Sequence, residues 1–144
     1  MPRLLTFLAA LGALAAGPAP AGETAFVVVA HPAVTVSELP RVQLSRLFLK
    51  RSTEWPDGSP VRPVEPLDPK LRESFARRVH ERSPADVAAY WNALIFSGRE
   101  LPPLEKATDA DVIAYVRATP GAIGYVAAGA DTSGVRLVTV ERER

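Results

Sequence analysis

Short apolar strands alternate with helical segments along this 144-residue chain, and that order most limits the folds open to it. Residues 26–30 (Phe-Val-Val-Val-Ala) form a continuous β-rich run, which is typical of a strand buried on both faces, as in a parallel sheet. Further strands are expected at residues 61–65, 122–126 and 135–140. Pro63 indicates that the strand over 61–65 lies at an edge or stops pairing early.

Three helix starts follow from capping residues. Asp68-Pro69 and Ser83-Pro84 each place a capping side chain directly before a proline. Thr108 stands three residues before an aspartate and approximates a capping box. An earlier helix is expected from Ser37–Pro40 onward. The order β-α-β-α-α-α-β-β predicts an α/β fold with a mostly parallel sheet flanked by helices.

The first 21 residues have the pattern of a cleaved secretory signal peptide. Arg3 precedes an apolar run over residues 4–16, and Ala19-Pro20-Ala21 supplies the small residues that a signal peptidase recognises. The run is shorter than the roughly 20 residues of a membrane span, although an uncleaved anchor stays open as an alternative. We therefore expect a periplasmic or secreted protein, with a single domain over residues 22–144.

Charge and composition exclude several classes of function. Without residues 1–21 the chain has 16 basic and 16 acidic residues, a balance that argues against a nucleic-acid partner. The chain has no cysteine, which excludes disulfides, thiolate catalysis and cysteine-ligated zinc. It also lacks a nucleophile elbow, a zinc-protease motif and a phosphate-cradling glycine loop. We expect neither an enzyme nor a cofactor.

Three segments together resemble one family. They are Leu44–Leu49 with the Trp-Pro-Asp-Gly turn at 55–58, the Tyr-Trp-Asn at 90–92 with Ile-Phe-Ser-Gly at 95–98, and Thr-Pro-Gly-Ala-Ile-Gly-Tyr-Val at 119–126. In this order they are similar to segments of phosphate-type periplasmic ABC-transporter solute-binding proteins. The resemblance implies a type II periplasmic-binding-protein-like fold. Full-length members have two lobes that close on the ligand, and this chain has residues for a single lobe.

The phosphate-binding motif of that family is altered here. The family's segment of form Arg-x-Asp-x-Ser-Gly-Thr corresponds to residues 65–71, where Glu65 replaces the arginine and Pro69-Lys70-Leu71 replaces Ser-Gly-Thr. Proline lacks the backbone donor, and Glu65 and Asp68 repel an anion. The family's phosphate ligands are therefore not assigned to these positions.

Four residues stay candidates for contacting a ligand: Ser37, Arg72, His31 and Tyr125. His31 and Ser37 follow the first expected strand, Arg72 lies in the first turns of a helix, and Tyr125 lies near a strand end, where open α/β sheets bind ligands. Helix capping, solvation and packing are the structural alternatives. Neither His31 nor His80 has companions at metal-ligand spacing, so no metal site is expected.

Two hypotheses of function result. The first is an exported solute-binding-protein-like module of the phosphate ABC-transporter type, with weak or absent binding of a small oxyanion such as phosphate. The second is a periplasmic interaction or sensor-accessory module that has lost its ligand. The expected partner is an envelope membrane protein or a second subunit that supplies the missing lobe.

Overall fold

The computed structural model describes residues 24–142, so the expected signal peptide over 1–21 lies outside the described residues. In chain order the elements are β1 (Phe26–Ala30), β2 (Glu38–Pro40), α1 (Arg41–Phe48), β3 (Arg62–Pro66), α2 (Pro69–Phe75), the π-helical segment η1 (Ala76–His80), α3 (Pro84–Phe96), β4 (Leu104–Lys106), α4 (Asp109–Ala118), β5 (Ala122–Ala127) and β6 (Arg136–Glu141). No helix within residues 24–142 has the length and apolar character needed to span a membrane.

The strands form a mixed sheet in the order β2-β6-β1-β5-β3-β4. Three of its pairings are parallel, namely β2 with β6, β3 with β4 and β3 with β5. Strand β1 is antiparallel to both of its neighbours, β5 and β6, which corrects the parallel setting expected for it. A continuous apolar run indicates burial on both faces but does not fix strand direction.

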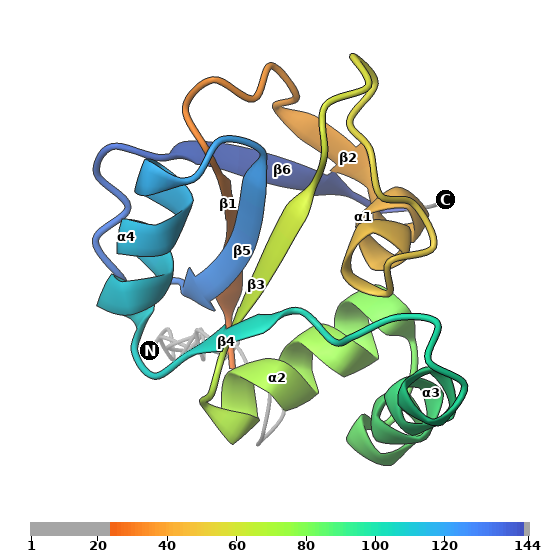
Figure 1. Cartoon of the computed structure of the whole chain (residues 1–144). Helices are drawn as coiled ribbons and strands as arrows, with labels where there is room; N and C mark the ends of the chain where they lie inside the picture. The colour runs from red at the N-terminus through yellow and green to blue at the C-terminus, as the bar shows by residue number, and fades with distance from the viewer. Residues whose placement is uncertain (1–23, 143–144) are drawn as a thin grey trace, which may run out of the picture.

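Helices cover both faces of the sheet, with α4 on one side and α1 and α2 on the other (Figure 1). The side chains of β5 alternate between the two layers. Ile123 and Tyr125 pack with α1 and α2, whereas Ala122 and Val126 pack with α4. The expected α/β fold with helices on the faces of a sheet is confirmed.

The helix starts follow the capping pattern in three of four cases. Asp68 accepts a hydrogen bond from the Lys70 amide at 2.9 Å, and Ser83 and Thr108 accept from amides three residues later at 3.1 Å. The fourth expected helix is present as α1, but it begins at Arg41 without a side-chain cap, because Glu38–Pro40 forms the short strand β2. Proline favours this boundary, since its fixed φ suits an extended residue directly before a helix.

Two short strands escaped the sequence analysis. Both β2 and β4 have three residues, too few to show an alternating pattern. Strand β4 lies at one edge of the sheet beside β3. Pairing of β3 with β4 begins at Val64, so Pro63 has a partner strand on the β5 side only. The edge position considered for this strand was wrong, because β3 lies between β5 and β4 and pairs as far as Pro66.

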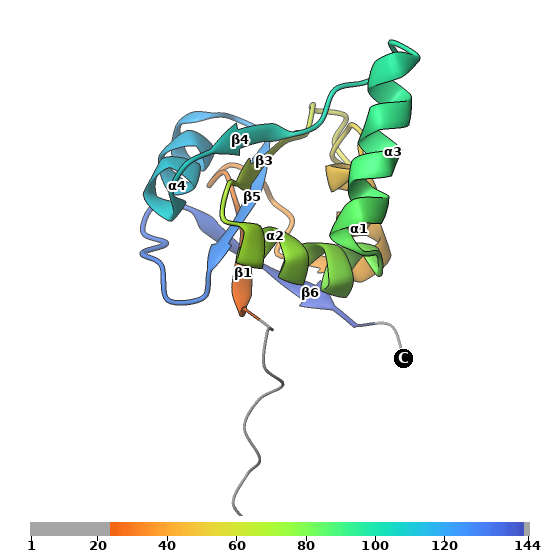
Figure 2. The ribbon, with the colours of Figure 1, turned by 90° about the horizontal axis from the view of Figure 1, so that it is seen from below.

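Helix α3 lies at the outside of the molecule, where it packs against η1 (Figure 2). Its sequence is almost entirely apolar, yet Trp91 is its only buried residue. The Tyr90 hydroxyl donates a 2.6 Å hydrogen bond to the Leu49 carbonyl and ties α3 to the end of α1. Ile95 is 45% exposed and Phe96 is 92% exposed, so this helix leaves an apolar surface open to solvent.

Gly124 permits the close approach of three elements at the centre of the sheet. A Cβ atom on this residue would lie 2.8 Å from Val64 Cγ1 on β3 and 3.0 Å from Val112 Cγ1 on α4. Both distances are shorter than van der Waals contact, so a larger residue forces β3 or α4 outward. The glycine is required here for packing within the protein, one of the two roles expected of a glycine in a strand.

We predict that Gly124→Ala lowers the free energy of unfolding by about 1–3 kcal/mol, the usual cost of overpacking a filled core. Urea unfolding of the purified protein measures the change. Gly129→Ala is the matched control, because a Cβ at Gly129 meets no atom within 4 Å. Equal unfolding midpoints for the two variants would contradict this account of the β3–β5–α4 contact.

Candidate functional site

Charged side chains gather at the carboxyl end of β3. Glu65 on β3 pairs in register with Glu105 on β4, so the two carboxylates lie side by side on the sheet. Like charges directly opposite one another destabilise a sheet unless a cation lies between them. Arg72 supplies that cation from α2, which starts only a few residues after β3 ends.

Arg72 binds both carboxylates at once. Its Nη2 lies 3.2 Å from Glu65 Oε2, and its Nη1 donates to Glu105 Oε1 at 2.8 Å. The two terminal nitrogens are thus directed at carboxylates of the protein itself. An arginine that recognises phosphate or carboxylate uses these same donors as a fork, so this geometry leaves Arg72 poorly placed to hold an external anion.

Glu65 is the member of this group whose protonation is most affected by burial. The residue is only 8% exposed. Burial raises the pKa of Glu65 to about 7, with the charge of Arg72 opposing the shift and that of Glu105 adding to it. A carboxylic acid in this state carries a proton for part of the time at neutral pH. The group formed by Glu65, Arg72 and Glu105 therefore changes from net neutral to net negative as Glu65 ionises.

Tyr125 belongs to the aromatic core beneath this charged group. Its ring stacks on Phe75 with centroids 3.9 Å apart and meets Phe26 and Phe48 edge to face. The residue is 1% exposed, and burial together with the negative charge of Glu65 raises the pKa of its hydroxyl far above the ordinary value. Tyr125 is therefore neutral, and its ring is fixed by packing on several sides.

The start of α2 offers little to an anion. Asp68 already accepts from the Lys70 amide, and Pro69 has no amide hydrogen. The negative charge of Asp68 occupies the place that a bound anion takes at an open helix start. The start of α2 therefore offers an external anion neither an amide at residue 69 nor an uncompensated positive end.

A cavity of about 100 Å³ lies over the charged group. It has roughly the volume that three water molecules occupy in the liquid. Its walls are formed by β3, α2, η1, β5 and the inner face of α3: Glu65, Arg72, Phe75, Ala76, His80, Pro84, Val87, Ala88, Trp91 and Tyr125. The cavity is smaller than the 300–1,000 Å³ of ordinary small-molecule sites, so only a few atoms fit beside Arg72 and Tyr125.

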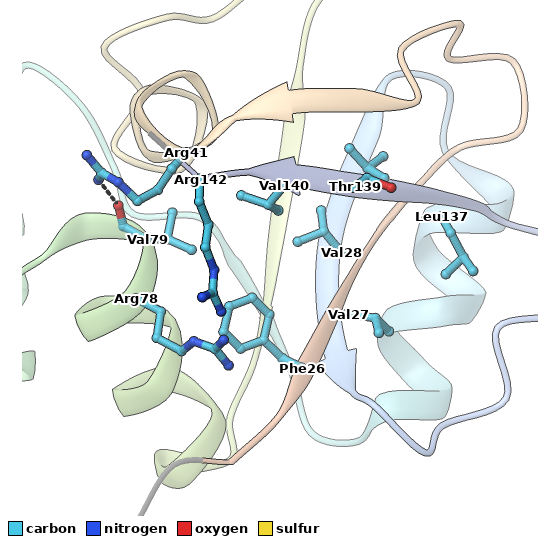
Figure 3. A pocket seen from close by; sticks show the side chains of 11 residues that line it. Phe26, Val27, Val28, Arg41, Arg78, Val79, Leu137, Thr139, Val140 and Arg142 are labelled. Atoms are coloured by element: carbon cyan, nitrogen blue, oxygen red, sulfur yellow. Dashed lines mark hydrogen bonds between the residues drawn. The ribbon is translucent and has the colours of Figure 1, made fainter. Parts of the chain in front are cut away.

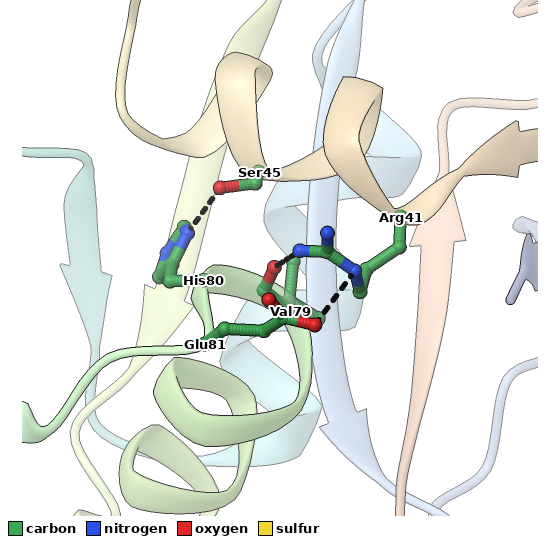
Figure 4. A network of polar contacts seen from close by, with 5 residues as sticks. All are labelled: Arg41, Ser45, Val79, His80 and Glu81. Carbon is green, nitrogen blue, oxygen red and sulfur yellow. Dashed lines mark hydrogen bonds and ion pairs between the residues drawn. The ribbon is translucent and has the colours of Figure 1, made fainter. Parts of the chain in front are cut away.

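His80 lines the same cavity and is held as a neutral ring. Its Nδ1 lies 2.7 Å from Ser45 Oγ on α1, and its ring meets Phe75 edge to face (Figure 4). Burial lowers the pKa of His80 to about 4, and the positive charges of Arg82 and Arg41 add to the shift. Because His80 is neutral at pH 7, it contributes no cation to this cavity.

The four candidate residues from the sequence do not form one site in the structure. Arg72 and Tyr125 line one cavity with Glu65. His31 lies at the opposite end of the sheet, where its amide donates to the Ala122 carbonyl and its Nδ1 accepts from Ala33. The antiparallel direction of β1 explains this separation, because the end of β1 meets the beginning of β5. Ser37 is exposed before β2, and its carbonyl accepts from Thr139.

Glu105 was missed by the sequence analysis although it is the nearest partner of Arg72. It lies on the three-residue strand β4, which has no pattern of its own. Its register opposite Glu65 depends on a pairing that only the folded chain shows. Within residues 24–142 no three histidine, aspartate or glutamate side chains come together in a group that could hold a metal ion.

Solved structures of phosphate-transport proteins share this fold. A protein of Clostridium perfringens described as a phosphate ABC transporter substrate-binding protein, with phosphate bound, has a TM-score of 0.63 and 19% identity over 81% of this chain and 45% of its own. An ABC-type phosphate transport receptor of Vibrio cholerae has a TM-score of 0.65 and 17% identity over 84% of this chain and 48% of its own. PstS of Borrelia burgdorferi has a TM-score of 0.56 and 12% identity over 82% of this chain and 47% of its own.

The chain thus spans less than half the length of these neighbours. Their fold matches the single-lobe α/β architecture expected from the sequence. No family model matches the sequence, and no curated protein matches it.

We predict a pH-dependent stability difference between the wild-type protein and Glu65→Gln. The folded pKa of Glu65, about 7, lies above its ordinary value of 4.5, so the folded state holds this proton more tightly than the unfolded state. The contribution of protonated Glu65 is fully present below pH 4.5 and is lost as the pH rises through 7. Wild-type stability should fall relative to Glu65→Gln by roughly 3 kcal/mol over this range.

Urea unfolding at about pH 4.5 and about pH 8 measures the difference for both proteins, with the window set by the two pKa values. The comparison cancels the opposite contribution of His80, which is lost as the pH falls from 6.5 towards 4. Glu73→Gln is the control, because Glu73 is an exposed carboxylate that pairs with Arg77. A difference between wild type and Glu65→Gln that stays constant with pH would show that Glu65 is not buried as a protonated acid.

Proposed function

We propose that this chain is an exported solute-binding-protein-like module of the phosphate ABC-transporter type, which binds small oxyanions weakly at most. The likeness of its fold to phosphate-transport proteins supports the type. The leader pattern of residues 1–21 supports export to the periplasm or the medium. The module acts as a binding or adaptor component and not as an enzyme.

The observation that carries the weak-binding part is the double engagement of Arg72. Both of its terminal nitrogens lie within 3.2 Å of Glu65 or Glu105. A phosphate that enters here has to displace a carboxylate from Arg72 and approach a second one. The charge-assisted hydrogen bonds that Arg72 can donate are already made to Glu65 and Glu105. Coulomb repulsion from the displaced carboxylate further opposes the binding of phosphate.

The exposure of Arg72 and Glu105 to water lowers the affinity for an oxyanion further. Arg72 is 34% exposed and Glu105 is 44% exposed on their side chains. A charged hydrogen bond in contact with water gains less than one in a closed, water-free site. An oxyanion bound beside Arg72 on this exposed face therefore stays in contact with solvent.

We predict that calorimetry with inorganic phosphate gives a dissociation constant weaker than about 1 mM for the wild-type protein. The double variant Glu65→Gln/Glu105→Gln releases Arg72 and removes both repelling charges. It should bind phosphate about tenfold more tightly than wild type, since each charged hydrogen bond regained contributes about 1.5 kcal/mol or more.

Glu73→Gln again provides the control, because it removes one nearby surface carboxylate without touching Arg72. A low-micromolar dissociation constant for wild type would overturn the weak-binding proposal. Equal affinities for the double variant and Glu73→Gln would show that the two carboxylates do not limit binding.

The exposed surface of α3 favours the second hypothesis, an interaction module. Apolar side chains at Ile95, Phe96, Leu101 and Leu104 lie open to solvent on α3, β4 and the segment between them. A helix that is apolar all round is normally buried. An envelope protein that contacts the module through α3 accounts for this composition, and such contact requires no bound oxyanion.

We predict that a photo-crosslinking amino acid in place of Phe96 captures one envelope protein in cells that make this chain. Ala114, an exposed residue on α4, provides the matched position on an unrelated helix. Mass spectrometry of the crosslinked product identifies the partner. Equal labelling from both positions would contradict a specific contact at α3, and products made only of this chain would show self-association in place of a partner.

A further inference from the structure

A second, larger groove lies away from the charged group of β3. It has a volume of about 390 Å³, which is within the range of small-molecule sites. Residues of β1, β6, η1 and the start of α1 line it, together with Arg142 after β6: Phe26, Val27, Val28, Arg41, Arg78, Val79, Leu137, Val138, Thr139, Val140 and Arg142. None of the residues of the Glu65–Arg72–Glu105 group takes part.

The floor of the groove is apolar. Val28 and Val138 face each other in register on β1 and β6 and are 2% and 5% exposed. The Phe26 ring forms the wall next to η1, and Val140 extends the surface towards the end of β6 (Figure 3). This floor can hold the hydrocarbon body of a ligand, and each buried CH₂ group stabilises such a complex by roughly 0.8 kcal/mol.

Two arginines meet at one end of this floor. The Arg78 guanidinium lies over the Phe26 ring, 5.6 Å from its centroid. The Arg142 side chain extends towards the same ring from the other direction (Figure 3). Within residues 24–142 neither of them forms an ion pair with a carboxylate.

The remaining arginine of the groove is engaged elsewhere. Arg41 donates to the Val79 carbonyl at 2.6 Å and lies 3.5 Å from Glu81 (Figure 4). Among residues 24–142, no acidic side chain lines the groove. Two guanidinium groups therefore converge beside an apolar floor without a counter-charge in the groove lining, and their mutual repulsion is relieved when an anion lies between them.

We propose that this groove binds a small organic anion: a carboxylate with an acyl or aryl body. The carboxylate lies between Arg78 and Arg142, where a planar guanidinium can donate two parallel hydrogen bonds. The body lies along Phe26, Val28, Val138 and Val140. Inorganic phosphate satisfies the charge but covers none of the partly exposed apolar surface of Phe26 and Val140, so the site distinguishes an organic anion from a simple oxyanion. The inference does not depend on the function proposed above.

The test is an NMR titration of the ¹⁵N-labelled protein with 4-phenylbutyrate, its neutral amide and inorganic phosphate. Phenylbutyrate should give saturable shifts centred on the amides of Val28, Val138 and Val140. The neutral amide and phosphate should each bind about tenfold more weakly, because one lacks the charge and the other lacks the apolar body. Arg78→Gln and Arg142→Gln should each weaken phenylbutyrate binding by about tenfold.

Arg77→Gln is the matched control on η1, since Arg77 pairs with Glu73 and does not line the groove. Its affinity for phenylbutyrate should equal that of wild type. The proposal is overturned by an absence of saturable shifts, by shifts centred on another part of the protein, or by equal binding of the neutral amide or of phosphate. Equal affinities for Arg78→Gln and Arg77→Gln would overturn it as well.

Discussion

Strand β5 is the element on which the arrangement of this protein depends. It is paired on both sides, antiparallel to β1 and parallel to β3, and thereby joins the two halves of the sheet. Its side chains alternate between the helix layers, and Gly124 allows β3 and α4 to approach it closely. Because Tyr125 follows Gly124 and points to the other face, the same strand also provides the floor beneath Glu65 and Arg72.

Local sequence patterns predicted much of this fold, whereas features that depend on contacts between distant residues were missed. Asp68, Ser83 and Thr108 fix helix starts through bonds to amides two or three residues away, which a sequence shows directly. Strand direction depends on pairing partners far apart in the chain, so the antiparallel setting of β1 was missed, and with it the separation of His31 from Arg72. The three-residue strands β2 and β4 carry no pattern that a sequence analysis detects.

The group formed by Glu65, Arg72 and Glu105 could also be predicted only in part from the sequence. Glu65 and Pro69 could be singled out from the sequence as residues unsuited to an anion, because one adds negative charge and the other lacks a backbone donor. The engagement of Arg72 by Glu105 could not be predicted, since it arises from the register of β3 with β4. An arginine near a helix start indicates anion binding only when its donors are free, and that condition is a property of the folded structure.

The two cavities therefore differ in how their positive charges are compensated. Next to β3, Arg72 is shared by two carboxylates in a cavity too small for an ordinary ligand. Beside Phe26, Arg78 and Arg142 converge on a larger groove, and no acidic residue of the described part of the chain lines it. A cation paired within the protein stabilises strand pairing, whereas cations without such partners keep their interaction energy for an external anion. Charge compensation, and not the number of arginines, thus distinguishes the two cavities and is the basis on which an anion site is proposed beside Phe26.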